Sequence, residues 1–147
     1  MLTQSSVNNN AQIATAQKIK IAEGVKHIQY NAFASNTTIN QVVIPDGTTC
    51  IYEGAFNNCT NLQSIIIPNS VTYIGESAFA NCSSLKSIEI SNSVIYIGKY
   101  IFAYCNSLTT ITFQGTKEEW GALVGEKDLG LNSGVSIVCT NGTIVTE

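Results

Sequence analysis

A repeat of 23 residues is the feature that most constrains this chain. Four units follow one another without insertion, and a fifth begins at Ile111 and then changes character. The complete units are residues 19–41, 42–64, 65–87 and 88–110. In this register seven positions of the unit hold apolar or small residues, with Asn36 as the main departure. One column is phenylalanine in every complete unit: Phe33, Phe56, Phe79 and Phe102. Columns that recur at one fixed period predict a repeat architecture.

The length of the unit decides which repeat architecture is possible. Units with paired helices need more residues, so this period suits one coil of a solenoid with one short strand. Residues 62–67 alternate as a strand with one buried face does, and Pro68 ends that strand because proline donates no ladder hydrogen bond. We expect turns at Gly75 and Gly98 and about one helical turn over residues 76–81. Each coil then stacks on the next at about 4.8 Å.

The third unit carries a family resemblance. It reads Ile65-x-Ile67-Pro68-Asn69-Ser70-Val71-x-x-Ile74-Gly75-x-x-Ala78-Phe79-x-x-Cys82-Ser83-Ser84-Leu85. This pattern resembles the BspA-like leucine-rich repeats of bacterial surface proteins. The fourth unit departs from it at Ser91 and Ile101, and the first departs at Asn36. The resemblance implies a right-handed leucine-rich repeat solenoid with parallel strands, mostly β and loop with short helical turns. Members of that family are mostly surface or secreted proteins implicated in adhesion.

The chain divides into three segments. Residues 1–18 fit the repeat poorly and are expected to form an N-terminal tail or partial cap. Residues 19–113 form the repeat array, and residues 114–147 form a C-terminal cap. In that cap, Thr116 and Glu119 have the spacing of a capping box at the start of a short helix. Trp120 in this helix is expected to cover the last coil, and a hairpin around residues 141–142 follows.

Composition narrows the function. The seven basic residues are all lysine and the formal net charge is −3, which is atypical of a nucleic-acid-binding protein. The longest aliphatic run, residues 65–67, is far too short for a membrane span, so no membrane insertion is expected. The chain has one histidine and two aspartates, an inventory from which few enzyme mechanisms can be assembled. We therefore expect no catalytic residues, no metal site and no cofactor.

Two further candidates are interpreted as structural. Cys59, Cys82 and Cys105 lie one repeat apart, and zinc sites need closer pairs, so we expect a ladder of buried reduced thiols. His27 has no nearby nucleophile and orienting acid, so it is expected to be a surface or half-buried member of its column.

The best candidate binding site is the outward row of the predicted strands, called the sheet face here. Its members are Lys20, Val43, Ile66, Glu89 and Thr112. Two adjacent apolar residues on a polar face indicate a contact surface, although β-propensity alone also favours Val and Ile there. Five strands make a platform of about 19 Å. A second candidate is the turn side of the fourth unit, where Tyr96, Tyr100 and Tyr104 lie.

These observations favour a non-catalytic module that binds a protein or glycan, with self-association also possible. A structural spacer or assembly module is the alternative. The family resemblance implies an extracellular or cell-surface location in the parent protein. Residues 1–16 lack the pattern of a signal peptide, so the chain is either a piece of a longer secreted protein or an intracellular protein.

Overall fold

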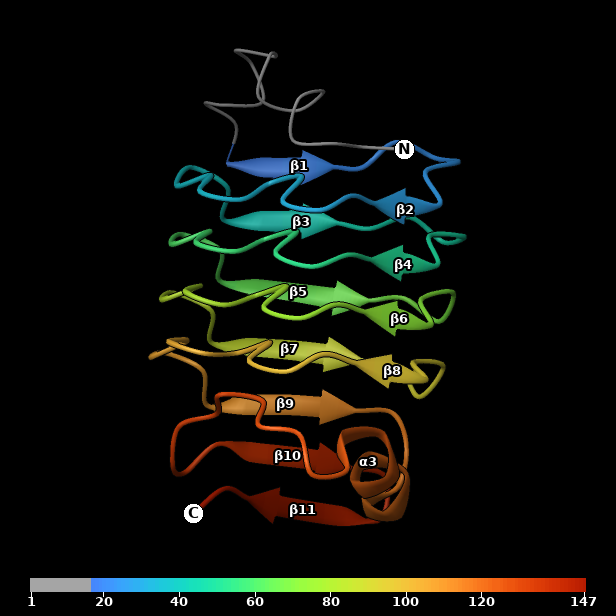
Figure 1. Ribbon diagram of the computed structural model, residues 1–147, viewed down its shortest axis with the longest axis vertical. Coiled ribbons are helices and arrows are strands. Elements are labelled where there is room, and N and C mark those ends of the chain that lie inside the picture. Colours follow the sequence, from blue (N-terminus) through green and yellow to red (C-terminus); the bar gives the residue numbers. More distant parts are fainter. Residues whose placement is uncertain (1–16) are drawn as a thin grey trace.

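The computed structural model describes residues 17–147 and shows a stack of coils (Figure 1). On one side, the coils form a seven-stranded sheet in the order β1-β3-β5-β7-β9-β10-β11. The strands are β1 (Lys18–Lys20), β3 (Gln41–Val43), β5 (Ser64–Ile67), β7 (Ser87–Ile90), β9 (Thr110–Phe113), β10 (Ser136–Cys139) and β11 (Gly142–Val145). Neighbours within the array are parallel, and Ile65 pairs with Ile88, one repeat later. This register confirms the predicted solenoid of 23-residue coils.

Each complete coil has a second strand on its other side, so the expectation of one strand per coil was incomplete. These strands form a parallel four-stranded sheet in the order β2-β4-β6-β8. They are β2 (His27–Ile28), β4 (Cys50–Ile51), β6 (Tyr73–Ile74) and β8 (Tyr96–Ile97). Every strand buries its isoleucine and leaves the preceding residue at least partly exposed. Two residues are too few to show an alternating pattern in the sequence.

A third ladder of backbone hydrogen bonds runs along the turns between these sheets. The amides of Gly54, Phe56 and Asn58 donate to the carbonyl oxygens of Glu76, Ala78 and Ala80, and the other coils repeat this pattern. Every second amide of the turn points toward the next coil in this way because two residues of each turn have positive φ. The helical turn expected over residues 76–81 is therefore a series of tight turns, interrupted at Ser77 and Asn81.

The core lies between the sheets and the turns and consists of the predicted columns. Phe33, Phe56, Phe79 and Phe102 stack in order, at centroid distances of 5.1, 5.4 and 6.3 Å. All four rings are at most 1% exposed. Full burial of such a side chain contributes about 1.5–3 kcal/mol, and no coil achieves it without its neighbours.

The C-terminal cap closes the last coil. Helix α3 (Lys117–Val124) starts at Thr116 with the expected capping box, in which Thr116 and Glu119 bond to each other's backbone amides. Trp120 is buried edge-on against Phe113 at 5.3 Å, as predicted for a cover of the final coil. The hairpin β10–β11 also forms, but β10 pairs in parallel with β9. The sheet therefore has seven strands instead of five, and its six gaps give a width of about 29 Å.

The predicted N-terminal segment, residues 1–18, lies almost entirely outside the described residues. Its last residue, Lys18, is the first residue of β1, so the array begins one residue earlier than expected. Within residues 17–147, no helix is long and apolar enough to cross a membrane.

Candidate functional site

The predicted sheet-face residues do lie in one outward row, and every pair of neighbours in it except Val43 and Ile66 is a register pair. Lys20 pairs with Val43, Ile66 with Glu89, and Glu89 with Thr112. Ile66 is 63% exposed, Lys20 and Thr112 are exposed, and Val43 and Glu89 are half-buried. Beyond the predicted row, Val138 of β10 is opposite Thr112 and is also exposed. Val138 was not predicted, because the cap does not follow the 23-residue period.

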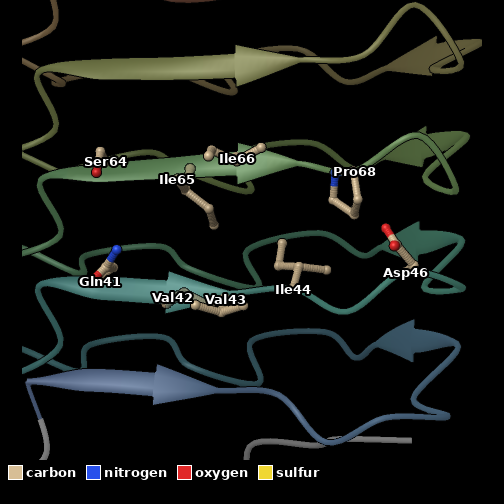
Figure 2. Close-up of a pocket in the computed structure, with 9 residues that line it drawn as sticks. All are labelled: Gln41, Val42, Val43, Ile44, Asp46, Ser64, Ile65, Ile66 and Pro68. Carbon is tan, nitrogen blue, oxygen red and sulfur yellow. The ribbon is translucent and has the colours of Figure 1, made fainter.

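A shallow hollow interrupts this sheet between β3 and β5 (Figure 2). The pairing of these strands stops at Val42 with Ile65, whereas β5 and β7 pair over four residues. Proline explains why the ladder does not reach Ile44: Pro68 has no amide hydrogen for the carbonyl of Ile44, whereas Gln114 donates to Ile90 at the corresponding place. The hollow has a volume of about 290 Å³, and Val43 and Ile66 are among the residues that line it.

The three predicted tyrosines do not form one group. Tyr96 lies in β8, where its ring stacks on Tyr73 at 4.7 Å and Lys127 Nζ lies 5.7 Å from its centroid. Tyr100 and Tyr104 lie instead at the turn and line a separate hollow of about 490 Å³. We call this second space the turn-side hollow. Sequence position alone did not separate these residues, because the course of the chain between β8 and the turn was not predictable.

Tyr100 and Tyr104 both have left-handed backbone conformations, with φ of 54° and 60°. Their columns otherwise contain residues that tolerate this region: Asn31, Gly54 and Ser77 in the first, and Ser35, Asn58 and Asn81 in the second. For a bulky residue the left-handed region costs about 1–2 kcal/mol. Strain of this kind is concentrated at functional sites in proteins. The fourth coil therefore places two exposed aromatic rings where packing does not require them.

A row of aromatic residues along the four-stranded sheet was not predicted as a group. Tyr30 stacks on Tyr52 at 4.9 Å, Tyr52 contacts Tyr73 at 5.8 Å, and Tyr73 stacks on Tyr96. The Tyr73 hydroxyl donates a hydrogen bond of 2.6 Å to Glu53. This bond, together with burial, raises the pKa of Tyr73. Because the rings stack on each other, this row stabilises neighbouring coils and leaves few ring faces for a ligand.

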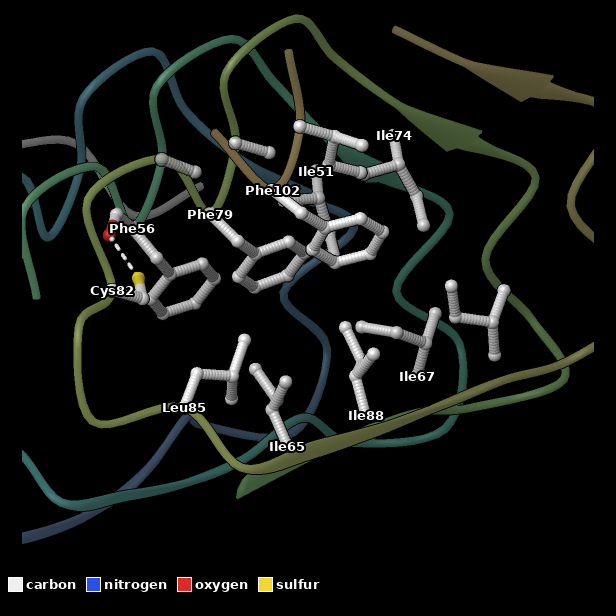
Figure 3. Close-up of a cluster of buried hydrophobic side chains, with 14 of the residues drawn as sticks. Ile51, Phe56, Ile65, Ile67, Ile74, Phe79, Cys82, Leu85, Ile88 and Phe102 are labelled. Carbon is white, nitrogen blue, oxygen red and sulfur yellow. Dashed lines mark hydrogen bonds between the residues drawn. The ribbon is translucent and has the colours of Figure 1, made fainter. Parts of the chain in front are cut away.

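The predicted ladder of buried thiols forms and has an additional role, which Figure 3 shows for Cys82 and Phe56. Cys59, Cys82 and Cys105 are buried and free, and each donates its thiol hydrogen to a phenylalanine carbonyl of the preceding coil at 3.1–3.2 Å. Burial raises the pKa of Cys59 to about 12 and that of Cys105 to about 11. These neutral thiols therefore act as small apolar side chains that also satisfy a buried carbonyl.

His27 is half-buried in the first coil, and its ring meets Tyr52 edge-on at 5.6 Å. Over residues 17–147, no three His, Cys, Asp or Glu side chains come together as a metal site requires. The described part of the chain thus presents its polar groups as rows along the stack.

Parallel coils, repeat columns and a helical cap define the class of protein as a leucine-rich repeat solenoid. A family model described as the BspA type leucine rich repeat region, in six copies, matches residues 8–124. The chain belongs to this family, as its third unit suggested. A comparison with curated proteins finds no match.

Several solved bacterial structures are similar. A leucine-rich repeat protein of T. pallidum is 28% identical with a TM-score of 0.71, over 86% of this chain and 57% of that one. A leucine rich cell surface protein of Faecalibacterium prausnitzii is 28% identical with a TM-score of 0.58, over 80% of this chain and 36% of that one. The pneumococcal vaccine antigen PcpA is 19% identical with a TM-score of 0.70, over 99% of this chain and 38% of that one, which shows a shared fold. This chain spans 36–57% of the length of these structures.

Proposed function

We propose that this chain is a non-catalytic binding module of a bacterial surface or secreted protein, and that its sheet face docks a protein partner. Family membership supports a repeat module. The surface location is supported by relatives described as a cell surface protein and a vaccine antigen. The observation that carries the docking proposal is Ile66, which is 63% exposed beside Val43 at the edge of a hollow.

The geometry favours a protein partner for this face. Val43, Ile66 and Val138 present apolar surface over several strands, and polar residues lie between and around them. An apolar side chain inserted between β3 and β5 would bury Ile66 without breaking a strand pair there. The only ion pair found among the described residues joins the exposed side chains of Lys20 and Glu23 at 3.9 Å, and such pairs contribute little.

The same features set the expected strength and rate of binding. A platform of about 29 Å is small, so one module should bind weakly, and several copies should bind more tightly through effective concentration. The low charge provides little electrostatic steering, so association should be slow and only weakly dependent on salt.

An adhesion experiment tests the proposal. Beads that carry many copies of the chain should bind cultured epithelial cells, and soluble chain should compete with them. The double variant Val43→Lys with Ile66→Lys adds two charges to the sheet face without changing a core residue, so it should fold normally and lose at least tenfold in bead adhesion. The control Asn92→Lys with Ile95→Lys adds the same charge at two exposed positions outside this sheet.

Two results would contradict the sheet-face proposal. In one, the sheet-face variant adheres as well as the control does. In the other, treatment of the cells with protease leaves adhesion unchanged, which excludes a protein receptor. If beads with the unchanged chain do not adhere at all, the structural spacer becomes the better interpretation.

A further inference from the structure

The turn-side hollow has the side chains of a small-molecule site. Tyr100 and Tyr104 form aromatic walls, with exposed fractions of 46% and 70%. The lining also includes the small residues Ser77, Ala80 and Ala103, together with Gly130 of the loop that precedes β10. Gly130 is close enough to Ala103 that a β carbon there would lie 2.6 Å from its backbone, so this loop packs tightly onto the last coil. The volume of about 490 Å³ is within the usual range for small ligands.

Three of the lining residues, Asn57, Asn81 and Asn132, supply side-chain amides to this hollow. Asn81 donates a hydrogen bond of 3.2 Å to Asn57 Oδ1, and Asn132 donates one of 3.4 Å to Asn106. Each side-chain amide has two donors and one acceptor, which is more than these single bonds use. None of the residues that line the hollow carries a charge. The site therefore offers ring faces and neutral hydrogen-bonding groups together.

We propose that the turn-side hollow is a subsite for a neutral saccharide. A pyranose has an apolar face that packs on a tyrosine ring, and its hydroxyls both donate and accept hydrogen bonds, as side-chain amides do. An uncharged lining does not favour an anionic ligand such as a nucleotide, because phosphate recognition normally uses Lys or Arg. The strained backbone of both tyrosines is explained if the rings serve a ligand.

A neighbouring hollow extends the site along the stack. It has a volume of about 300 Å³ and shares Asn57 and Ser77 with the turn-side hollow. Tyr30 lies in its lining, and so do the carboxylates of Glu53 and Glu76. Two hollows that share lining residues fit an oligosaccharide that runs across the coils. The carboxylates predict a preference for neutral over acidic sugars, because like charges repel. This proposal does not depend on the sheet face being a docking site.

The repeat itself supplies the variants for a test. Tyr100→Ser and Tyr104→Asn replace each tyrosine by the residue that the third coil has at the same position, where φ is also positive. Both changes relieve strain, so the melting temperature of the double variant should stay the same or rise. Binding is measured by saturation-transfer NMR and calorimetry with maltotetraose, cellotetraose, chitotetraose and lacto-N-tetraose, and with sialyllactose as the acidic probe.

The expected result is that at least one neutral tetrasaccharide binds more tightly than sialyllactose and that the double variant weakens this binding at least tenfold. The sheet-face variant Val43→Lys with Ile66→Lys should bind the same sugar as the unchanged chain does, which separates this proposal from the preceding one. The proposal is wrong if no neutral tetrasaccharide binds, if the double variant binds within twofold of the unchanged chain, or if sialyllactose binds best. A fall in melting temperature on mutation would show that the two tyrosines serve the fold instead.

Discussion

Replacement of Phe79 by alanine is the sharpest test of how the coils hold together. The Phe79 ring is fully buried in the third coil, between Phe56 at 5.4 Å and Phe102 at 6.3 Å. Loss of its burial costs about 1.5–3 kcal/mol, and each ring pair adds about 0.5–1.5 kcal/mol. Tight packing on all sides prevents the site from collapsing, so we expect Phe79→Ala to lower the free energy of unfolding by about 3–5 kcal/mol.

Phe33 provides a matched control in the same column. It is as deeply buried as Phe79 but stacks on a single ring, that of Phe56, among the described residues. Phe33→Ala should therefore cost about 0.5–1.5 kcal/mol less than Phe79→Ala, the value of one ring pair.

Urea unfolding followed by circular dichroism gives both numbers. Fluorescence of Trp120, which is buried in the cap, reports whether the array and the cap unfold together. Equal costs for Phe33→Ala and Phe79→Ala would refute the argument that stacking between coils stabilises the core. A cost below about 1 kcal/mol for Phe79→Ala would refute its placement in the core.

Three further predictions concern the thiols, the cap and a pair of glycines. Burial raises the pKa of Cys59 to about 12 and that of Cys105 to about 11, so folding favours the neutral thiols. Their contribution to stability is complete below the unfolded pKa near 9 and is lost as the pH rises above it. Urea midpoints should therefore fall from about pH 9 upward, and thiol labelling of the native protein at pH 8 should be slow. Thr116→Ala removes the N-cap of α3 and should cost about 1 kcal/mol in urea unfolding, whereas an unchanged midpoint would mean that the cap does not contribute to stability. Gly75→Ala would place a β carbon 2.5 Å from a backbone nitrogen of the preceding coil and should lower stability by about 1–3 kcal/mol. Gly121 lies in a helix with open space around it, so Gly121→Ala should raise stability by about 1 kcal/mol. Thermal melts should therefore shift in opposite directions for the two variants.

Much of the architecture was predictable because each coil repeats the same solution. The isoleucine and phenylalanine columns identify the residues that the stack buries, and their period identifies the coil. The capping box at Thr116 and the turn at residues 141–142 are local signals, so they were also readable. The outward position of Ile66 follows from strand alternation alone.

Other features depended on contacts between segments far apart in the sequence. Gly75 was predicted as a turn residue, but its φ is not positive, and a β carbon at Gly75 or at Gly98 would meet the backbone of the preceding coil. The second strand of each coil is too short to leave a pattern. The pairing of β10 with β9 depends on how the cap folds back, which no local signal shows.

The two candidate sites divide in the same way. The sequence by itself determined the row of the sheet face, because a strand's period fixes which residues point outward. Only the tertiary structure separated Tyr96 from Tyr100 and Tyr104, and brought the latter two together with Asn81 and Gly130. The physical reason is that the turns hold left-handed residues whose amides bond to the next coil, and a loop of the cap closes the last turn. Such a hollow forms only when coils and cap are stacked.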